Sequence, residues 1–120
     1  VTVVVEPKPH WAEDMRAFCP TWSDAQLALR AEWLHTCQWG AIRIAFDGFH
    51  TDDIHQDIPK ITKPARLVIA GGATVVDADD QAEIARLNPA IEQRIVPDAG
   101  HMIPWDNLPG FLNAVMDFNA

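Results

Sequence analysis

The sequence predicts an α/β fold with about three parallel strands, flanking helices and a helical insertion. Residues 1–6, VTVVVE, form a nearly unbroken β-branched run that is typical of a strand buried on both faces of a parallel sheet. Residues 65–118 alternate between strand-like and helix-like patterns, which predicts a right-handed parallel unit. Helical patterns between residues 11 and 50 interrupt this order, as a cap inserted between two strands would.

The first half of the chain is expected to be mainly helical after its opening strand. Pro7 and Pro9 end that strand because proline supplies no N–H donor to a sheet. Ser23 and Gln26 have the spacing of a capping box at the start of a helix. A second helical run, AIRIAFDGF, follows Gly40, and residues 51–64 are read as a polar connecting loop.

Aromatic and cysteine residues are expected to form the interior of this helical region, and the alternative for one or two of the tryptophans is the lining of a pocket. Tryptophan side chains are large enough to fill a small helical core. Neither cysteine belongs to a zinc-binding spacing, and both lie in apolar stretches where a buried thiol is the ordinary state. The residues concerned are Trp11, Trp22, Trp33, Trp39, Cys19 and Cys37.

The second half is predicted to be strand, helix, strand and helix in that order. The two strands are ARLVIAGG at 65–72 and IEQRIVP at 91–97. The helix ADDQAEIARL at 78–87 has acidic residues in its first turn, where the helix dipole favours them, and LPGFLNAVMDF at 108–118 is the closing helix. The chain therefore divides into a strand and turn at 1–10, a helical cap region at 11–58 and a C-terminal α/β segment at 59–120.

Composition excludes several classes of partner. The formal net charge of −8 argues against nucleic acid and against an anionic membrane surface, and no apolar run has the length of a membrane span. The stretch HTDDIHQD at 50–57 contains potential metal ligands, but their spacing fits no helix-face pair, so no metal is expected. A reducing cytoplasm is the expected location.

Two long stretches resemble the α/β-hydrolases. The segment PARLVIAGG…ADDQAEIARLNPAIEQRIVPDAGHMIPWDNLPGFLNAVMDF is similar to the last third of that fold. The segments EDMRAFCPTWSDAQLALRAEWLHTC and AFDGFHTDDIHQD resemble the cap of the N-formylmaleamate deformylases, a subgroup of amidohydrolases. The resemblance implies a partial α/β-hydrolase fold with a helical cap over the active site. It also implies a small carboxylate-bearing amide or ester as substrate, and no cofactor.

Within this resemblance, His101 in the sequence Asp-Ala-Gly-His is the candidate catalytic base. The chain contains no G-x-S-x-G motif, and its single serine, Ser23, is assigned to the capping box. Cys19 and Cys37 lack the glycines of a nucleophile elbow. The nucleophile is therefore expected to lie outside these 120 residues.

The acid of the triad has two candidates. Thr74 stands where most α/β-hydrolases carry an aspartate, and a hydroxyl cannot stabilise an imidazolium as a carboxylate does. The deformylase subgroup places the acid at the end of the strand before the cap, which corresponds to Glu6. Glu6 as acid and Glu6 as a solvated strand-end charge stay equally open, and Asp77 is the second candidate. Arg16 and Arg30 are possible contacts for a substrate carboxylate.

Two functional hypotheses follow. In the first, the chain is the cap and C-terminal part of a serine hydrolase, and the serine comes from elsewhere. In the second, it is a truncated and catalytically silent binding or assembly module. Because the chain begins with Val1, either a longer reading frame or processing of the N-terminus is expected. The Val1–Val5 strand edge is expected to pair with a missing N-terminal half, with a partner subunit or with a second copy of the chain.

Overall fold

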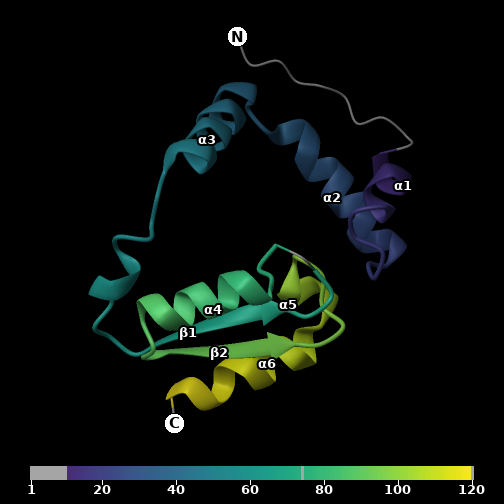
Figure 1. Ribbon diagram of the computed structural model, residues 1–120. Helices are drawn as coiled ribbons and strands as arrows, with labels where there is room; N and C mark the ends of the chain where they lie inside the picture. Colours follow the sequence, from purple (N-terminus) through teal and green to yellow (C-terminus); the bar gives the residue numbers. More distant parts are fainter. Residues whose placement is uncertain (1–10, 74, 120) are drawn as a thin grey trace. The chain divides into compact units, whose positions relative to one another are not determined.

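A computed structural model describes residues 11–73 and 75–119 (Figure 1). The described residues fall into two compact units, one ending at Asp52 and the other beginning at Asp53. The strand predicted at residues 1–6, together with Glu6 and Thr74, lies outside the described residues. Within the described ranges, no helix has the length and apolar character needed to cross a membrane.

The first unit contains three helices. They are α1 at Trp11–Arg16, α2 at Asp24–Thr36 and α3 at Trp39–Thr51. The capping box predicted for Ser23 is confirmed: its hydroxyl accepts the backbone N–H of Gln26, and the Gln26 side chain accepts the backbone N–H of Ser23 at 2.8 Å. Helices α1 and α2 pack together, and their small core is formed by Cys19, Trp22, Leu27 and Ala31.

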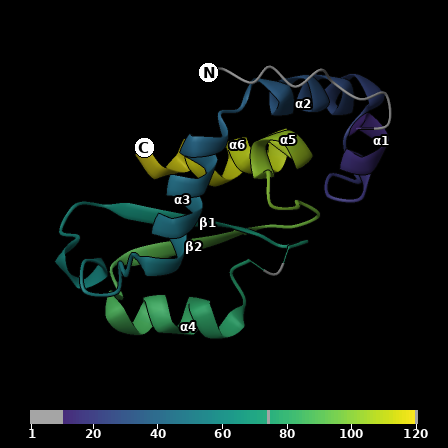
Figure 2. The same ribbon diagram turned by 90° about the horizontal axis from the view of Figure 1, so that it is seen from above.

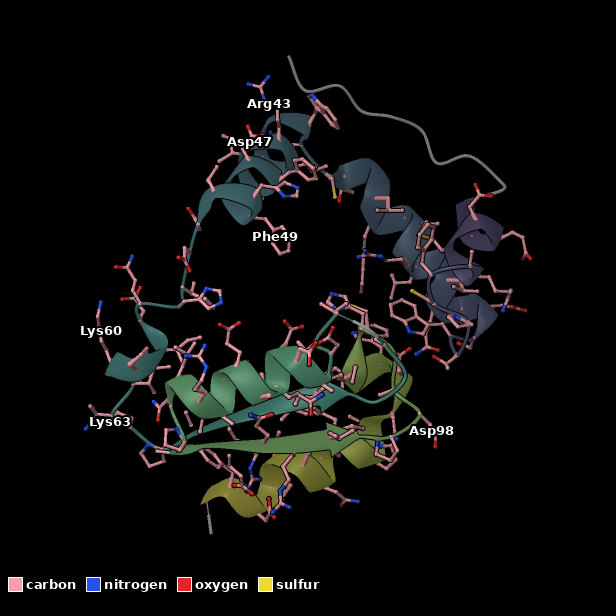
Figure 3. The ribbon with its side chains drawn as sticks, viewed as in Figure 1. Arg43, Asp47, Phe49, Lys60, Lys63 and Asp98 are labelled. Atoms are coloured by element: carbon pink, nitrogen blue, oxygen red, sulfur yellow. The ribbon has the colours of Figure 1, made fainter. Side chains whose placement is uncertain are left out.

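Helix α3 contributes no buried side chain to this unit. Its apolar residues Trp39, Ile42, Phe46 and Phe49 are 74%, 45%, 61% and 82% exposed. Figure 3 shows Phe49 on the side of α3 opposite Arg43 and Asp47. The prediction that Trp39 packs in a helical core is therefore wrong for this unit, and Trp33 is only partly covered at 38% exposure.

The two cysteines differ in their exposure to solvent. Cys19 is buried between α1 and α2, as predicted, whereas Cys37 is exposed at the C-cap of α2. The prediction of a buried thiol at Cys37 is wrong because the chain leaves the helix there in an extended conformation, beyond the part of α2 that packs on α1.

The second unit is built on a two-stranded parallel sheet. Strand β1 at Ala65–Ala70 pairs with β2 at Ile91–Val96, and the register runs from Ala65 opposite Ile91 to Ala70 opposite Val96. Helix α4 at Ala78–Leu87 lies on one face of this sheet, and α6 at Leu108–Met116 lies on the other (Figures 1 and 2). The predicted strand–helix–strand–helix order is confirmed.

Three short helical segments complete this unit. The connector predicted as a loop contains the 3-10 turn η1 at Ile58–Lys60. The short helix α5 at Ile103–Asp106, which the sequence pattern did not suggest, follows the predicted histidine loop. The closing helix continues into the 3-10 turn η2 at Asp117–Asn119.

The core of the second unit lies between β2 and α6. Val96 and Ala99 are almost fully buried, Ala114 from α6 packs against them, and Val68 and Ile103 cover the cluster. Gly110 allows the close approach of α6, since a Cβ at this position would lie 2.7 Å from Cγ1 of Val96. This packing attaches α6 to the end of β2, where the histidine loop begins.

Candidate functional site

The candidate site lies where the two parallel strands end. Strands β1 and β2 run in the same direction, so the loops that follow Ala70 and Val96 leave the same edge of the sheet (Figure 1). In open parallel sheets this carboxyl edge is the usual place for a ligand. The sequence of the second unit thus brings the loop at 97–102, with His101, to a position suited to chemistry.

Two glycines join the loops. The Gly71 amide donates to the Val96 carbonyl at 2.9 Å, and the Gly72 amide donates to the Ala99 carbonyl at 2.8 Å. A Cβ on Gly71 or Gly72 would lie 3.0 Å from the same acceptor oxygens, so a side chain would push the loops apart. The Gly-Gly pair after β1 therefore has a packing role in holding the histidine loop.

The loop after β2 turns sharply at Asp98. This residue has φ 57°, in the left-handed region that aspartate tolerates better than most residues. Its side chain points outward from the end of the sheet (Figure 3). Asn107, the N-cap of α6, donates to the Pro97 carbonyl at 2.9 Å and accepts the Gly110 amide at 2.9 Å. The turn is therefore attached to the first turn of α6.

His101 follows this turn and is exposed. It lines a cavity of about 170 Å³ whose other walls are aliphatic. The lining residues come from β1, from the loop after it and from α5: Val68, Ile69, Ala70, Ala73, Val75, Val76 and Ile103. An imidazole at the rim of an apolar cavity is accessible to a small substrate and to a nucleophile that approaches from outside the described residues.

The two candidates for the acid are in different situations. Asp77 is the N-cap of α4, and its Oδ1 accepts the backbone amides of Asp79 at 2.8 Å and Asp80 at 3.0 Å. Asp80 completes a capping box by accepting the Asp77 amide at 3.0 Å. The Asp77 carboxylate is thus engaged by its own helix. Glu6 lies outside the described residues, so its role stays a prediction.

Arg16 is engaged within the first unit, and Arg30 has no assigned role. Arg16 donates to Asp24 at 2.5 Å and to Glu13 at 3.5 Å, and these bonds raise the pKa of its guanidinium, with the Asp24 bond the larger cause. Arg16 is therefore committed to an ion-pair network at the junction of α1 and α2.

His55, in the stretch HTDDIHQD, lies between the carboxylates of Asp53 and Glu83, and these three side chains form the His55 clasp. The Nδ1 atom of His55 lies 2.5 Å from Oδ1 of Asp53, and its Nε2 lies 3.5 Å from Oε2 of Glu83 on α4. The side-chain bond to Asp53 is the main reason that the pKa of His55 is raised, while bonds from His55 lower the pKa of Asp53. Among the described residues, no group of three or more histidine, cysteine, aspartate or glutamate side chains is arranged to hold a metal ion.

The sequence is similar to curated hydrolases. It is 58% identical over 106 residues to the N-formylmaleamate deformylase of Pseudomonas putida strain KT2440, a match that covers 88% of this chain and 40% of the deformylase. It is 35% identical over 57 residues to the mouse (Mus musculus) sn-1-specific diacylglycerol lipase ABHD11, covering 48% of this chain and 19% of the lipase. No protein-family model matches the sequence.

Solved structures of hydrolases are also similar to this chain. A crystal structure of a serine-to-alanine variant of the N-formylmaleamic acid deformylase from Pseudomonas putida S16 is 60% identical with a TM-score of 0.76. The match covers 88% of this chain and 41% of that one. E-2-(acetamidomethylene)succinate hydrolase shares the fold at 18% identity and a TM-score of 0.66, covering 91% of this chain and 44% of that one.

Both solved structures share the fold of this chain over about nine tenths of its length. The chain spans about two fifths of the deformylases that it matches. The described residues have a partial α/β-hydrolase fold, and the chain is similar to the C-terminal portion of the N-formylmaleamate deformylases.

Proposed function

We propose that the chain is the cap and base-bearing part of a serine hydrolase that cleaves a small acidic amide, N-formylmaleamate or a close analogue, with release of formate. The observation that carries this proposal is the 58% identity to a deformylase over 106 residues. A related ester is the next substrate class to test. The cap region at 11–58 covers the active site in this proposal, and the enzyme is cytoplasmic.

His101 acts as the base in the proposed reaction. It takes the proton of the serine hydroxyl as that oxygen attacks the formyl carbon, and it gives the proton to the departing nitrogen. Water then attacks the formyl-enzyme, His101 takes its proton, and formate leaves while the serine regains its hydrogen. The exposed ring at the rim of the 170 Å³ cavity supports this role, because the nucleophile and the substrate must both reach it. The steps need neither a metal nor a cofactor.

Glu6 is the proposed acid. The capping bonds of Asp77 favour this assignment, since a carboxylate that accepts two amides of α4 is held by that helix. The serine comes from outside the 120 residues: from an N-terminal half of the same chain, from a partner subunit, or from a second copy that pairs along Val1–Val5.

A catalytically silent binding or assembly module is the second candidate. The observation that favours it is the absence of a G-x-S-x-G motif from the 120 residues, whose single serine caps α2. The two candidates make opposite predictions for the substitution of His101.

The test begins with the DNA in frame upstream of the Val1 codon, which is expected to encode a G-x-S-x-G motif. In the protein encoded by the complete frame, His101→Ala is expected to lower kcat/KM for N-formylmaleamate by about 10³-fold or more, measured as formate release. His55→Ala is the matched control, because it removes an exposed imidazole that belongs to the His55 clasp. Full activity of His101→Ala, or no activity in the unsubstituted protein, would support the silent module instead.

A further inference from the structure

The backbone that leads to His101 is held at successive residues by different elements. The Pro97 carbonyl accepts a bond from the side chain of Asn107, and the Ala99 carbonyl accepts the amide of Gly72. These bonds fix the turn as far as residue 99. The next residue, Gly100, directly precedes His101. A side chain that contacts Gly100 therefore acts on the backbone position of the histidine.

The carboxylate of Asp106 occupies the space beside Gly100. If Gly100 carried a Cβ, that atom would lie 3.0 Å from Oδ2 of Asp106, 3.5 Å from Cγ and 3.9 Å from Oδ1. A contact of 3.0 Å is closer than carbon and oxygen normally approach, so a side chain at residue 100 would displace the carboxylate or the loop. A side chain at residue 100 would therefore need the Asp106 carboxylate to move by a few tenths of an ångström.

Asp106 is itself held in place by the short helix that follows the histidine. Its amide donates to the Met102 carbonyl at 3.0 Å, and the Trp105 amide donates to the same carbonyl at 2.8 Å. The Asn107 amide donates to the Ile103 carbonyl at 2.9 Å, which fixes the end of α5. After His101 the chain therefore makes a single helical turn and brings the Asp106 carboxylate back against the residue that precedes the histidine.

We infer that Asp106 is a positioning residue for His101, and that its carboxylate acts through the contact with Gly100. The inference rests on the proposed function, because His101 is the base there. A base has to be held within tenths of an ångström of its working position, and displacements of about 1 Å cost on the order of 100-fold in rate. The contact adds to the bonds that Asn107 and Gly72 make with Pro97 and Ala99, so all three act on the backbone just before the histidine.

The test uses single and double substitutions in the protein encoded by the complete reading frame. Asp106→Ala is expected to lower kcat by about 10- to 100-fold while KM stays within about twofold, because the substrate is still bound but the base is misplaced. Asp106→Asn keeps the shape of the side chain and is expected to restore most of kcat. Asp52→Ala is the control, since it removes an exposed carboxylate outside the loop.

A double-mutant cycle tests the contact itself. Gly100→Ala alone is expected to lower kcat, because its Cβ meets the Asp106 carboxylate. In the Asp106→Ala background the same substitution is expected to cost several-fold less, since the space is open. If Asp106→Ala does not fold, the test uses Gly100→Ala and Asp106→Asn instead. For each of these variants kcat and KM are measured separately, as above.

Two results would overturn the inference. One is a loss of thermal stability in Asp106→Ala with kcat unchanged, and the other is strict additivity of the Gly100 and Asp106 effects on kcat. If the unsubstituted protein releases no formate, the proposed function fails, and the inference is decided by ¹³C relaxation of the His101 ring. Greater ring disorder in Asp106→Ala than in the unsubstituted protein supports positioning, and equal disorder overturns it.

Discussion

The side chain of Asn88 joins two segments of the second unit by hydrogen bonds. It is a buried polar residue, 7% exposed, at the C-cap of α4. Its Nδ2 donates to the carbonyls of Ile58 and Ile61 at 3.0 Å each, and its Oδ1 accepts the Ala90 amide at 3.1 Å. Both ends of the amide are therefore used, and the turn into β2 is fixed to the connector before β1.

Asn88→Asp is expected to destabilise the protein by about 1–3 kcal/mol, the usual cost of a buried polar group that loses its partners. An aspartate has the same shape, but its ionised carboxylate cannot donate to the carbonyls of Ile58 and Ile61. The free energy of unfolding is measured by urea titration. Asn113→Asp on the exposed side of α6 is the matched control and is expected to stay within about 0.5 kcal/mol of the unsubstituted protein. Equal effects of the two substitutions would refute the assigned role of Asn88.

At the scale of elements, the connector after Asp52 is held to α4 by the titratable side chain of His55. His55 lies between Asp53 on its own segment and Glu83 on the helix, and both carboxylates favour its protonated form. The folded-state pKa of His55 is thus above the value of about 6.5 for a free histidine. Its stabilising contribution is complete below pH 6.5 and is lost as the pH rises through the folded-state pKa.

The titration of His55 followed by NMR is expected to give a pKa above 6.5. Asp53→Asn is expected to lower that pKa towards 6.5, because it removes the largest cause of the shift. Asp52→Asn changes the net charge equally and is expected to leave the pKa nearly unchanged, which makes it the control. A titration of His55 at or below 6.5 in the unsubstituted protein would show that the clasp does not form.

The elements of the second unit are joined by Arg66, which lies on β1 with its side chain 7% exposed. Its guanidinium donates to Glu92 on β2 at 2.9 and 2.5 Å, to the Ala114 carbonyl at 2.6 Å and to Asp117, and it stacks on the ring of Phe118 at 4.9 Å. Bonds to Glu92 and then Asp117 raise the pKa of Arg66, and the Arg66 bond is the main cause that lowers the pKa of Asp117. A single side chain thus connects both strands to the end of α6.

Arg66→Lys is expected to lower the melting temperature, although the charge is retained. A lysine is a point charge without the planar fork that serves several acceptors at once. Arg43→Lys on the exposed surface of α3 is the control and is expected to leave the melting temperature unchanged. Equal melting temperatures for Arg66→Lys and the unsubstituted protein, measured by circular dichroism, would contradict this role of the fork.

For the molecule as a whole, the order of elements in residues 65–118 and the helix start at Ser23 could be predicted from local chemistry. Turn residues, capping spacing and alternating strand and helix patterns act within a few residues, so the sequence displays them directly. The position of His101 at the carboxyl edge of the sheet also follows, because parallel strands end on the same side. The exposure of Trp39 and Cys37 could not be predicted from the sequence. An apolar side chain is buried only where another surface of the same unit packs against it, and the sequence pattern does not reveal that surface.

Contacts between residues distant in the chain required the tertiary structure. The attachment of Asn88 to the connector, the fork of Arg66 and the clasp of His55 each depend on segments that only the fold brings together, and no local pattern reports them. Asp106 is close to Gly100 in the chain, but its carboxylate lies beside Gly100 only because one turn of α5 follows His101. The residue order alone thus predicted most of the elements, and the family resemblance indicated His101 as the candidate base. Only three-dimensional packing placed the Asp106 carboxylate beside the residue that precedes this histidine.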